Sequence, residues 1–219
     1  AEGATYSNGT IYRAKNYGRT NCVLFGRQTE IDNASDYCMV GGSIEPGNDY
    51  TPTKIGNGYC SILWGEGNSS NFSSNDIIVG TGNTTNRTEF SAIFGENHNI
   101  NFGTTGSTRM MGITVGGQGT TVKNGSSECA AFGWTHTMEG AYTGAIGGYN
   151  NPIGIGAMCF GYSLKTPLFE PNGGGDYVWD NYSTVVGAYN DESHKYYTNS
   201  SSNPTRTWVE DHRFVVGTG

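Results

Sequence analysis

The sequence predicts an all-β protein made of short coils that stack on one another, and three observations lead to this fold class. Glycine supplies 35 of the 219 residues, and each glycine inside a helix costs about 1 kcal/mol relative to alanine. Asn, Ser and Thr, which favour turns, are abundant beside it. A short apolar run that ends in glycine also recurs along the chain, which is typical of a repeat protein.

The recurring glycines keep a nearly constant spacing over much of the chain. Gly65, Gly80 and Gly95 are equally spaced, and so are Gly133, Gly147 and Gly161. A period of about 14 to 15 residues corresponds to one small coil, which indicates a parallel β-roll or β-solenoid that turns at each glycine. The predicted turn glycines are Gly26, Gly41, Gly65, Gly80, Gly95, Gly116, Gly133, Gly147, Gly161, Gly187 and Gly217.

The apolar run before each glycine is expected to be a strand. The residue directly before the glycine is bulky, as in Trp64, Val79 and Phe94, and the two positions before it are nearly always apolar. Successive side chains of a strand point to opposite faces, so both faces of this strand need cover. A coil of about 14 residues, roughly 46 Å around, encloses little more than one layer of side chains. The other face therefore needs another chain or another part of this one.

A second apolar position follows many of the glycines by five or six residues. It predicts a second short strand on the opposite wall of the coil, so that FSAIFG would form one wall and ENHNI the corner and the second wall. Coils stacked about 4.7 Å apart through parallel ladders would bury continuous apolar columns. These second positions are Ile31, Ile100, Val122, Met138 and Ile153.

The longer steps mark insertions, which become surface loops in a solenoid. Residues 1–161 are predicted to form the repeat shaft or head. Residues 162–219 are predicted to continue the β-roll with two long loops, 162–184 and 188–213. The chain stops inside a repeat motif, which suggests a fragment of a longer protein.

Several runs resemble known repeats. SAIFGENHNI, TGAIGGYNNPI and STVVGAYNDES resemble the repeats of trimeric autotransporter adhesin heads, the YadA-like left-handed parallel β-roll, and the related repeats of bacteriophage fibre proteins. The closing HRFVVGTG is similar to a segment that often follows such repeats in phage and prophage tail fibres. The resemblance covers roughly 21–161 and 182–219. It implies a homotrimer in which three left-handed coils share a central hydrophobic axis.

The cysteines favour one of these two relatives. Cys22, Cys38, Cys60, Cys129 and Cys159 are odd in number and form no CxxC pair, so we expect reduced, buried thiols in the inner wall rather than a zinc site or a disulfide framework. Exported proteins tend to avoid unpaired thiols, whereas a virion component assembles in the reducing host cytoplasm. The cysteines therefore favour a phage fibre over an adhesin on a bacterial cell surface.

The two long loops contain aromatic residues beside carboxylates. Exposed rings cover the C–H faces of sugars while polar groups bind hydroxyls, so this composition is typical of a glycan-binding surface. The alternative is that these rings pack their own loops or a neighbouring chain. The candidate receptor- or glycan-binding residues are Tyr177, Trp179, Asp180, Tyr182, Tyr196, Tyr197 and Trp208.

Other classes of function have less support. A polysaccharide-degrading tailspike needs two opposed carboxylates. The sequence offers three candidate pairs, and the simpler interpretation is that they are solvated loop residues: Asp176 with Asp180, Asp191 with Glu192, and Glu210 with Asp211. We therefore expect no catalytic residue.

The four histidines form no metal-binding motif, so we expect no metal and no cofactor. The net charge of −7, without a basic cluster, argues against nucleic acid. The sequence contains no run of about 18 apolar residues, so we expect no insertion into a membrane.

The sequence thus predicts a structural fibre segment of a bacteriophage virion, from a tail or head fibre, that contributes to host-surface attachment. Its expected partners are two further copies of itself, other virion proteins, and a host cell-surface glycan or protein. The alternatives are a trimeric autotransporter-type adhesin head and a polysaccharide-degrading tailspike.

Overall fold

The computed structural model is all-β. It describes residues 4–5, 11–12, 15–17, 20–26, 29–32, 35–42, 52–101, 110–123, 126–166, 168–169, 178–179, 183–188 and 214–217. The chain divides into two compact units, Ala1–Thr120 and Thr121–Gly219, which we call unit 1 and unit 2. The sequence suggests a different boundary, at residue 161, between the repeat shaft and the part with the long loops. This boundary stays a prediction. Within the described ranges, no helix is long and apolar enough to cross a membrane.

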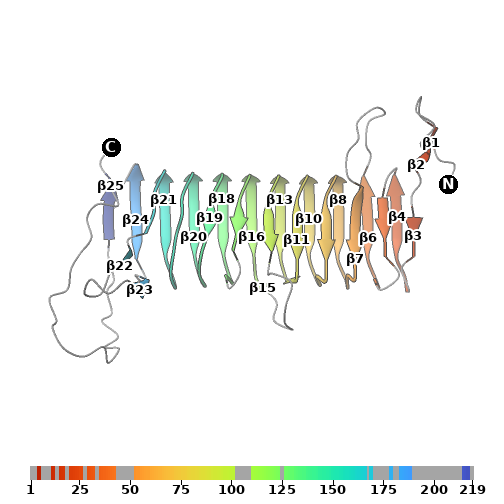
Figure 1. Ribbon diagram of the computed structural model, residues 1–219, viewed down its shortest axis with the longest axis horizontal. Helices are drawn as coiled ribbons and strands as arrows, with labels where there is room; N and C mark the ends of the chain where they lie inside the picture. The colour runs from red at the N-terminus through yellow and green to blue at the C-terminus, as the bar shows by residue number, and fades with distance from the viewer. Residues whose placement is uncertain are drawn as a thin grey trace. The chain divides into compact units, whose positions relative to one another are not determined.

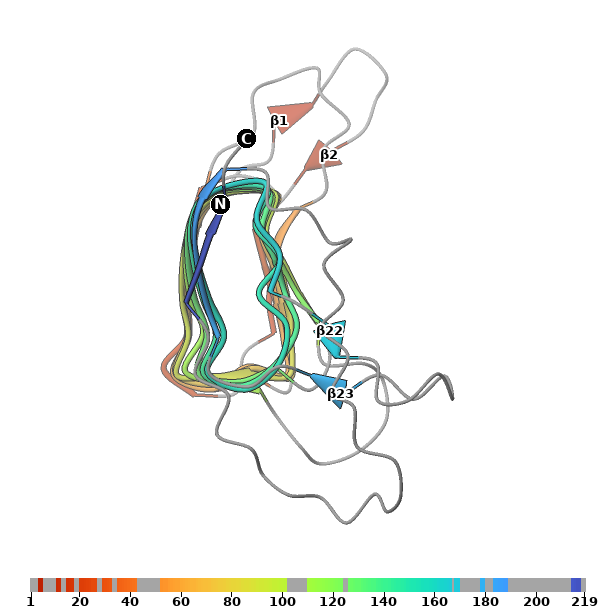
Figure 2. The ribbon, with the colours of Figure 1, turned by 90° about the vertical axis from the view of Figure 1, so that its left-hand side faces the viewer.

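Unit 1 contains two parallel sheets of short strands (Figure 1). The first, which we call the main sheet, holds in spatial order β4 (Val23–Gly26), β6 (Met39–Gly42), β8 (Ile62–Glu66), β10 (Ile77–Thr81), β13 (Ala92–Glu96) and β16 (Thr114–Gln118). The second sheet holds β3 (Lys15–Asn16), β5 (Thr29–Ile31), β7 (Thr53–Gly56), β9 (Ser69–Asn71), β11 (Thr84–Asn86) and β14 (Asn99–Asn101). Strands of the two sheets alternate along the chain, so each pair belongs to one coil. The end-on view shows the two sheets as facing walls (Figure 2).

A third ladder closes each coil of unit 1. It runs through single parallel bridges from Thr20 to Asp36, Tyr59, Ser74 and Glu89, and then pairs β12 (Thr88–Glu89) with β15 (Met110–Met111). The sequence predicts only two walls, because most residues of this third wall are polar and form no periodic apolar signal. The stacked-coil fold itself is confirmed.

The predicted glycine period sets the register of the main sheet, because residues one period apart pair in neighbouring strands. Ile62 pairs with Ile77 and Ile77 with Ala92, while Gly65, Gly80 and Gly95 form one row. Gly80 has φ +133°, and a Cβ on it would collide with the carbonyl oxygen of Gly95. Only glycine fits this row, because a side chain would meet both the strained backbone and the next coil.

Two of the predicted turn glycines stand one residue too early. Gly41 pairs with Trp64 inside the strand, and Gly116 pairs with Phe94. The row of paired turn glycines, which we call the turn register, contains instead the glycines that follow them, Gly42 and Gly117. Each pair is a Gly-Gly dipeptide, and the apolar run alone does not show which of the two glycines turns. The other predicted glycines lie in the turn register: Gly26, Gly65, Gly80, Gly95, Gly133, Gly147, Gly161, Gly187 and Gly217.

Unit 2 repeats the arrangement with a slightly shorter period where Gly133, Gly147 and Gly161 pair in a row. Its main sheet holds β18 (Ala130–Trp134), β20 (Gly144–Gly148), β21 (Met158–Tyr162), β24 (Thr184–Ala188) and β25 (Phe214–Gly217). Its second wall pairs β17 (Thr121–Val122) with β19 (Thr137–Met138). Two antiparallel pairs stand apart from the ladders: β1 (Ala4–Thr5) with β2 (Ile11–Tyr12) in unit 1, and β22 (Leu168–Phe169) with β23 (Val178–Trp179) in unit 2.

The coil interiors are filled by one apolar column from each of the two sheets. The second residue of each main strand points inward, and it meets the second apolar position that the sequence predicts. In unit 1 the fully buried columns contain Val40, Leu63, Ile78, Ile93 and Val115 from the main sheet, and Ile31, Ile55 and Ile100 from the second. In unit 2 they contain Ala131, Ala145, Cys159 and Val185, together with Val122, Met138 and Ile153.

The corner after each turn glycine is buried as well, although it is polar. The Asn68 side-chain amide donates to the carbonyls of Trp64 (3.0 Å) and Gly80 (2.7 Å), and its Oδ1 accepts from the Asn83 backbone N–H (3.0 Å). Asn83 repeats the pattern with Gly95 and His98. This ladder satisfies backbone groups that the turns leave unpaired inside the stack. Burial lowers the pKa of His98.

The cysteines are free thiols, and their burial differs from one to another. Cys38, Cys129 and Cys159 are buried as predicted, and burial raises the pKa of Cys38 to about 11 and of Cys159 to about 12. Cys22 is half-buried. Cys60 corrects the expectation of an inner-wall residue, since it is exposed at a corner with φ +51°.

Candidate functional site

The outward side of the main sheet is the most unusual surface of unit 1. We call it the outer face, and it consists of the first and third residues of each main strand. Val23, Phe25, Trp64, Ile77 and Phe94 are 43–49% exposed there, which confirms that both faces of these strands are apolar. None of its residues is charged: Val23, Phe25, Met39, Gly41, Ile62, Trp64, Ile77, Val79, Ala92, Phe94, Thr114 and Gly116.

The outward side of the second sheet has the opposite character. Lys54 Nζ donates to Glu30 Oε1 at 3.1 Å, and Asn86 Nδ2 donates to Asn101 Oδ1 at 3.0 Å. The other outward residues there include Ser69, Asn71, Thr84 and Asn99. The same coils thus present one polar wall, suited to water, and one apolar wall. A periodic apolar wall of this kind marks an interaction surface.

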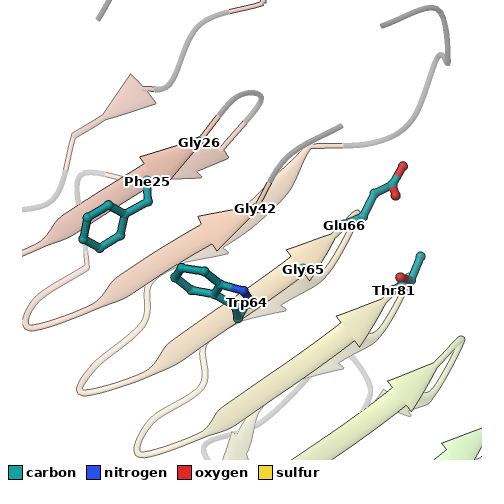
Figure 3. Close-up of a pocket in the computed structure, with 7 residues that line it drawn as sticks. All are labelled: Phe25, Gly26, Gly42, Trp64, Gly65, Glu66 and Thr81. Carbon is teal, nitrogen blue, oxygen red and sulfur yellow. The ribbon is translucent and has the colours of Figure 1, made fainter. Parts of the chain in front are cut away.

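Glycine and aromatic residues shape part of the outer face. The Trp64 ring lies where a Cβ on Gly41 would stand, and the Phe25 ring lies 6.2 Å from it at 53°. Together with Gly26, Gly42, Gly65, Glu66 and Thr81 these rings line a shallow hollow (Figure 3). The missing side chain at Gly41 leaves room for the Trp64 ring against the neighbouring strand.

Unit 2 has an outer face of the same kind. Phe132, Ile146 and Phe160 are 45%, 52% and 38% exposed, and the Met158 sulfur lies over Gly144. The remaining described members are Ala130, Thr184 and Val186, so this face is uncharged too. The feature therefore occurs independently in each unit.

Other exposed aromatic side chains lie on the coil corners and the third wall. Tyr37 and Tyr59 stack edge to face with ring centroids 5.8 Å apart, and the Arg87 guanidinium lies 5.6 Å from the Phe72 ring centre. In unit 2, Trp134, Tyr149 and Tyr162 are exposed at the ends of the main strands, just past the turn glycines. Sequence reasoning missed these last three because it looked for ligands in the insertions. Their signal is an aromatic residue one or two positions after the turn glycine.

The predicted ligand-binding residues fall outside the part of the chain that can be described. This applies to Tyr177, Asp180, Tyr182, Tyr196, Tyr197 and Trp208. Trp179 ends β23, but its side chain is not among those described. The three carboxylate pairs considered for catalysis lie outside as well. All of these remain predictions.

One carboxylate is fully buried inside unit 1. Asp76 Oδ1 accepts from the Ser91 backbone N–H at 2.9 Å, and Thr88 Oγ1 donates to Oδ2. Burial raises the Asp76 pKa to about 6. With no exposed surface, this group supports the stack and does not meet a substrate. Across the described ranges, no three metal-ligating side chains come together.

Comparison with known proteins found no family model, no curated protein and no solved structure that matches the chain. What the protein does must therefore be inferred from its surfaces.

Proposed function

We propose that the chain is a structural fibre segment of a bacteriophage virion, in which three copies pack their outer faces around a common axis. The observation that carries this proposal is the contrast between two walls of the same coils. The outer face is apolar and uncharged in both units, whereas the outward side of the second sheet in unit 1 carries hydroxyls, amides and an ion pair.

A second copy of the chain is the occupant that best suits this surface. Contacts made by one coil recur in the next when the partner has the same period, and an identical chain has that period by construction. A closed ring of copies covers every outer face without leaving one exposed. The number three comes from the resemblance of the repeats to trimeric β-rolls.

The remaining walls would face outward from such a trimer. They would carry the attachment role through exposed aromatic residues, with a host cell-surface glycan or protein and other virion proteins as partners. Five free thiols, three of them buried, support assembly in the reducing host cytoplasm. This role is binding and support, without turnover of a substrate.

The first test is the molar mass of the purified chain in solution by light scattering. We expect three times the chain mass of 23.4 kDa. A monomer at all concentrations would contradict the proposal, because the outer face would then lack a partner.

A second test separates the virion from the bacterial surface. Mass spectrometry of density-purified phage particles from the producing culture should find peptides of this chain at a constant ratio to the capsid protein. Peptides found only in the washed cell-envelope fraction would indicate the adhesin instead.

A further inference from the structure

Three aromatic side chains gather at one corner of unit 2, which we call the aromatic corner. Trp134 and Tyr162 are the last residues of β18 and β21, and Tyr149 directly follows β20. Their exposed fractions are 61%, 40% and 52%. In the ladder, Trp134 pairs with Gly148 and Gly148 with Tyr162, so the three rings occupy three successive coils.

The equivalent position in unit 1 shows that this corner is not an extension of the apolar outer face. The last residues of β8, β10, β13 and β16 are Glu66, Thr81, Glu96 and Gln118. Gln118 Nε2 donates to Glu96 Oε2 at 2.9 Å in an exposed pair. A position that accepts two carboxylates faces water, so the fold does not require large rings there.

The two tyrosine rings are held in place before any ligand arrives. Tyr149 and Tyr162 contact edge to face, with centroids 5.3 Å apart and planes at 68°. A Cβ on Gly148 would lie 3.0 Å from the Tyr162 ring, so the ring rests on the bare backbone of Gly148. The Tyr149 backbone N–H donates to the Trp134 carbonyl at 2.7 Å. Rings fixed in this way lose little conformational entropy on binding.

We infer that the aromatic corner binds a neutral carbohydrate chain. Neighbouring strands lie about 4.8 Å apart, so the Trp134 and Tyr162 backbones are roughly 9.5 Å apart, a span of about two residues of a linear sugar chain. The aromatic faces would cover sugar C–H groups, and the adjacent hydroxyl side chains of Thr135 and Ser163 would bind sugar hydroxyls. A protein partner would favour a broad apolar surface, which the outer face offers and this corner does not.

This inference rests on the attachment role proposed above, but it uses only residues of unit 2 and does not depend on the trimer. The probes are linear neutral hexasaccharides of glucose, galactose, mannose and N-acetylglucosamine, each titrated to millimolar concentration against the full chain. Binding is measured by saturation-transfer NMR, and the molar mass of every sample is measured by light scattering.

The variants are Trp134→Ala and Tyr162→Ala, with Tyr142→Ala as the matched control. Tyr142 is 56% exposed in the same unit but lies on a different wall. We expect at least one hexasaccharide to bind the native chain, and each corner variant to bind it roughly threefold to tenfold more weakly. The control should bind as the native chain does. Trp134→Tyr, which keeps a stacking face, should retain most of the affinity and guards against misfolding of the alanine variant.

The outcomes separate the two proposals. Absence of binding to all four probes, or an equal loss in Tyr142→Ala, overturns the aromatic corner as a sugar site even if the chain is trimeric. A change of molar mass in Trp134→Ala without a change in sugar binding also overturns it, because the corner would then contact another copy. Sugar binding by a monomer would leave the corner intact and overturn the trimer.

Discussion

Ile77 is the residue through which the outer face can be tested most directly. It is the first residue of β10, it is 43% exposed, and the coil that contains it also contains Thr84 on the second sheet. We consider Ile77→Lys, which places a charge on the apolar wall, and Thr84→Lys, which places the same charge on the polar wall of the same coil. The two variants have the same net charge and differ in the wall that carries the substitution.

The magnitude follows from the exposed fraction. Complete burial of an isoleucine side chain is worth about 1.5 to 3 kcal/mol, so covering the exposed 43% would contribute about 0.6 to 1.3 kcal/mol per chain. Three chains lose about 2 to 4 kcal/mol, or roughly 30-fold to several hundred-fold in the trimer association constant. Three ammonium groups near one axis add repulsion and desolvation, so these values are lower bounds.

The assay is light scattering over a dilution series. For three associating chains the midpoint concentration varies as the inverse square root of the association constant, so Ile77→Lys should raise the midpoint about fivefold to thirtyfold. Thr84→Lys should leave it unchanged, and circular dichroism should show that both variants are folded. An unchanged midpoint for Ile77→Lys, or the same shift for both variants, would refute the assignment of the outer face as the interface.

Two further predictions concern the interior of unit 1. Asn83→Ala removes hydrogen bonds to the Gly95 carbonyl (2.8 Å) and from the His98 N–H (3.0 Å), and it should lower the unfolding free energy by about 2 to 4 kcal/mol in denaturant titration. The exposed Asn99→Ala should cost under about 0.5 kcal/mol, and equal losses would show that the buried ladder is not stabilising. For Asp76, burial raises the folded-state pKa from 3.8 to about 6, so the folded state holds the proton more tightly than the unfolded state. Its stabilising effect is complete below about pH 4 and is lost as the pH rises through 6, by roughly 3 kcal/mol. Asp76→Asn should abolish this part of the pH dependence of unfolding, and an unchanged pH profile would contradict the assignment.

The period and the two-faced strand could be predicted from the sequence because each leaves a positional signal. Three successive apolar residues before a glycine require cover on both sides, and the structure places Ile78 inside the coil with Ile77 and Val79 outward. The third wall left no such signal. Ser73 is almost fully buried there, and its hydroxyl bonds to Asn71 and Thr88 instead of packing in an apolar column.

Local ambiguities account for most of the other differences. The Gly41-Gly42 dipeptide fits the pattern in two registers, and only pairing with the next coil selects Gly42. The polar corner residue His98 is typical of a surface turn in sequence, yet the fold buries it in a hydrogen-bonded ladder. Sequence reasoning missed the aromatic corner because it looked for ligands in the insertions, whereas Tyr149 and Tyr162 closely follow repeat glycines.

Because β8, β10 and β13 pair in strict register, the stack can lengthen or shorten only by whole coils. A duplication or deletion of one complete period, such as residues 66–80, restores every glycine, every inward side chain and every corner amide to an equivalent place. Each such event would lengthen or shorten the stack by one strand spacing, about 4.8 Å, and would keep the backbone register of the main sheet. The length of the stack could therefore evolve by duplication or deletion of one repeat in the gene, independently of the ligand that the corners bind.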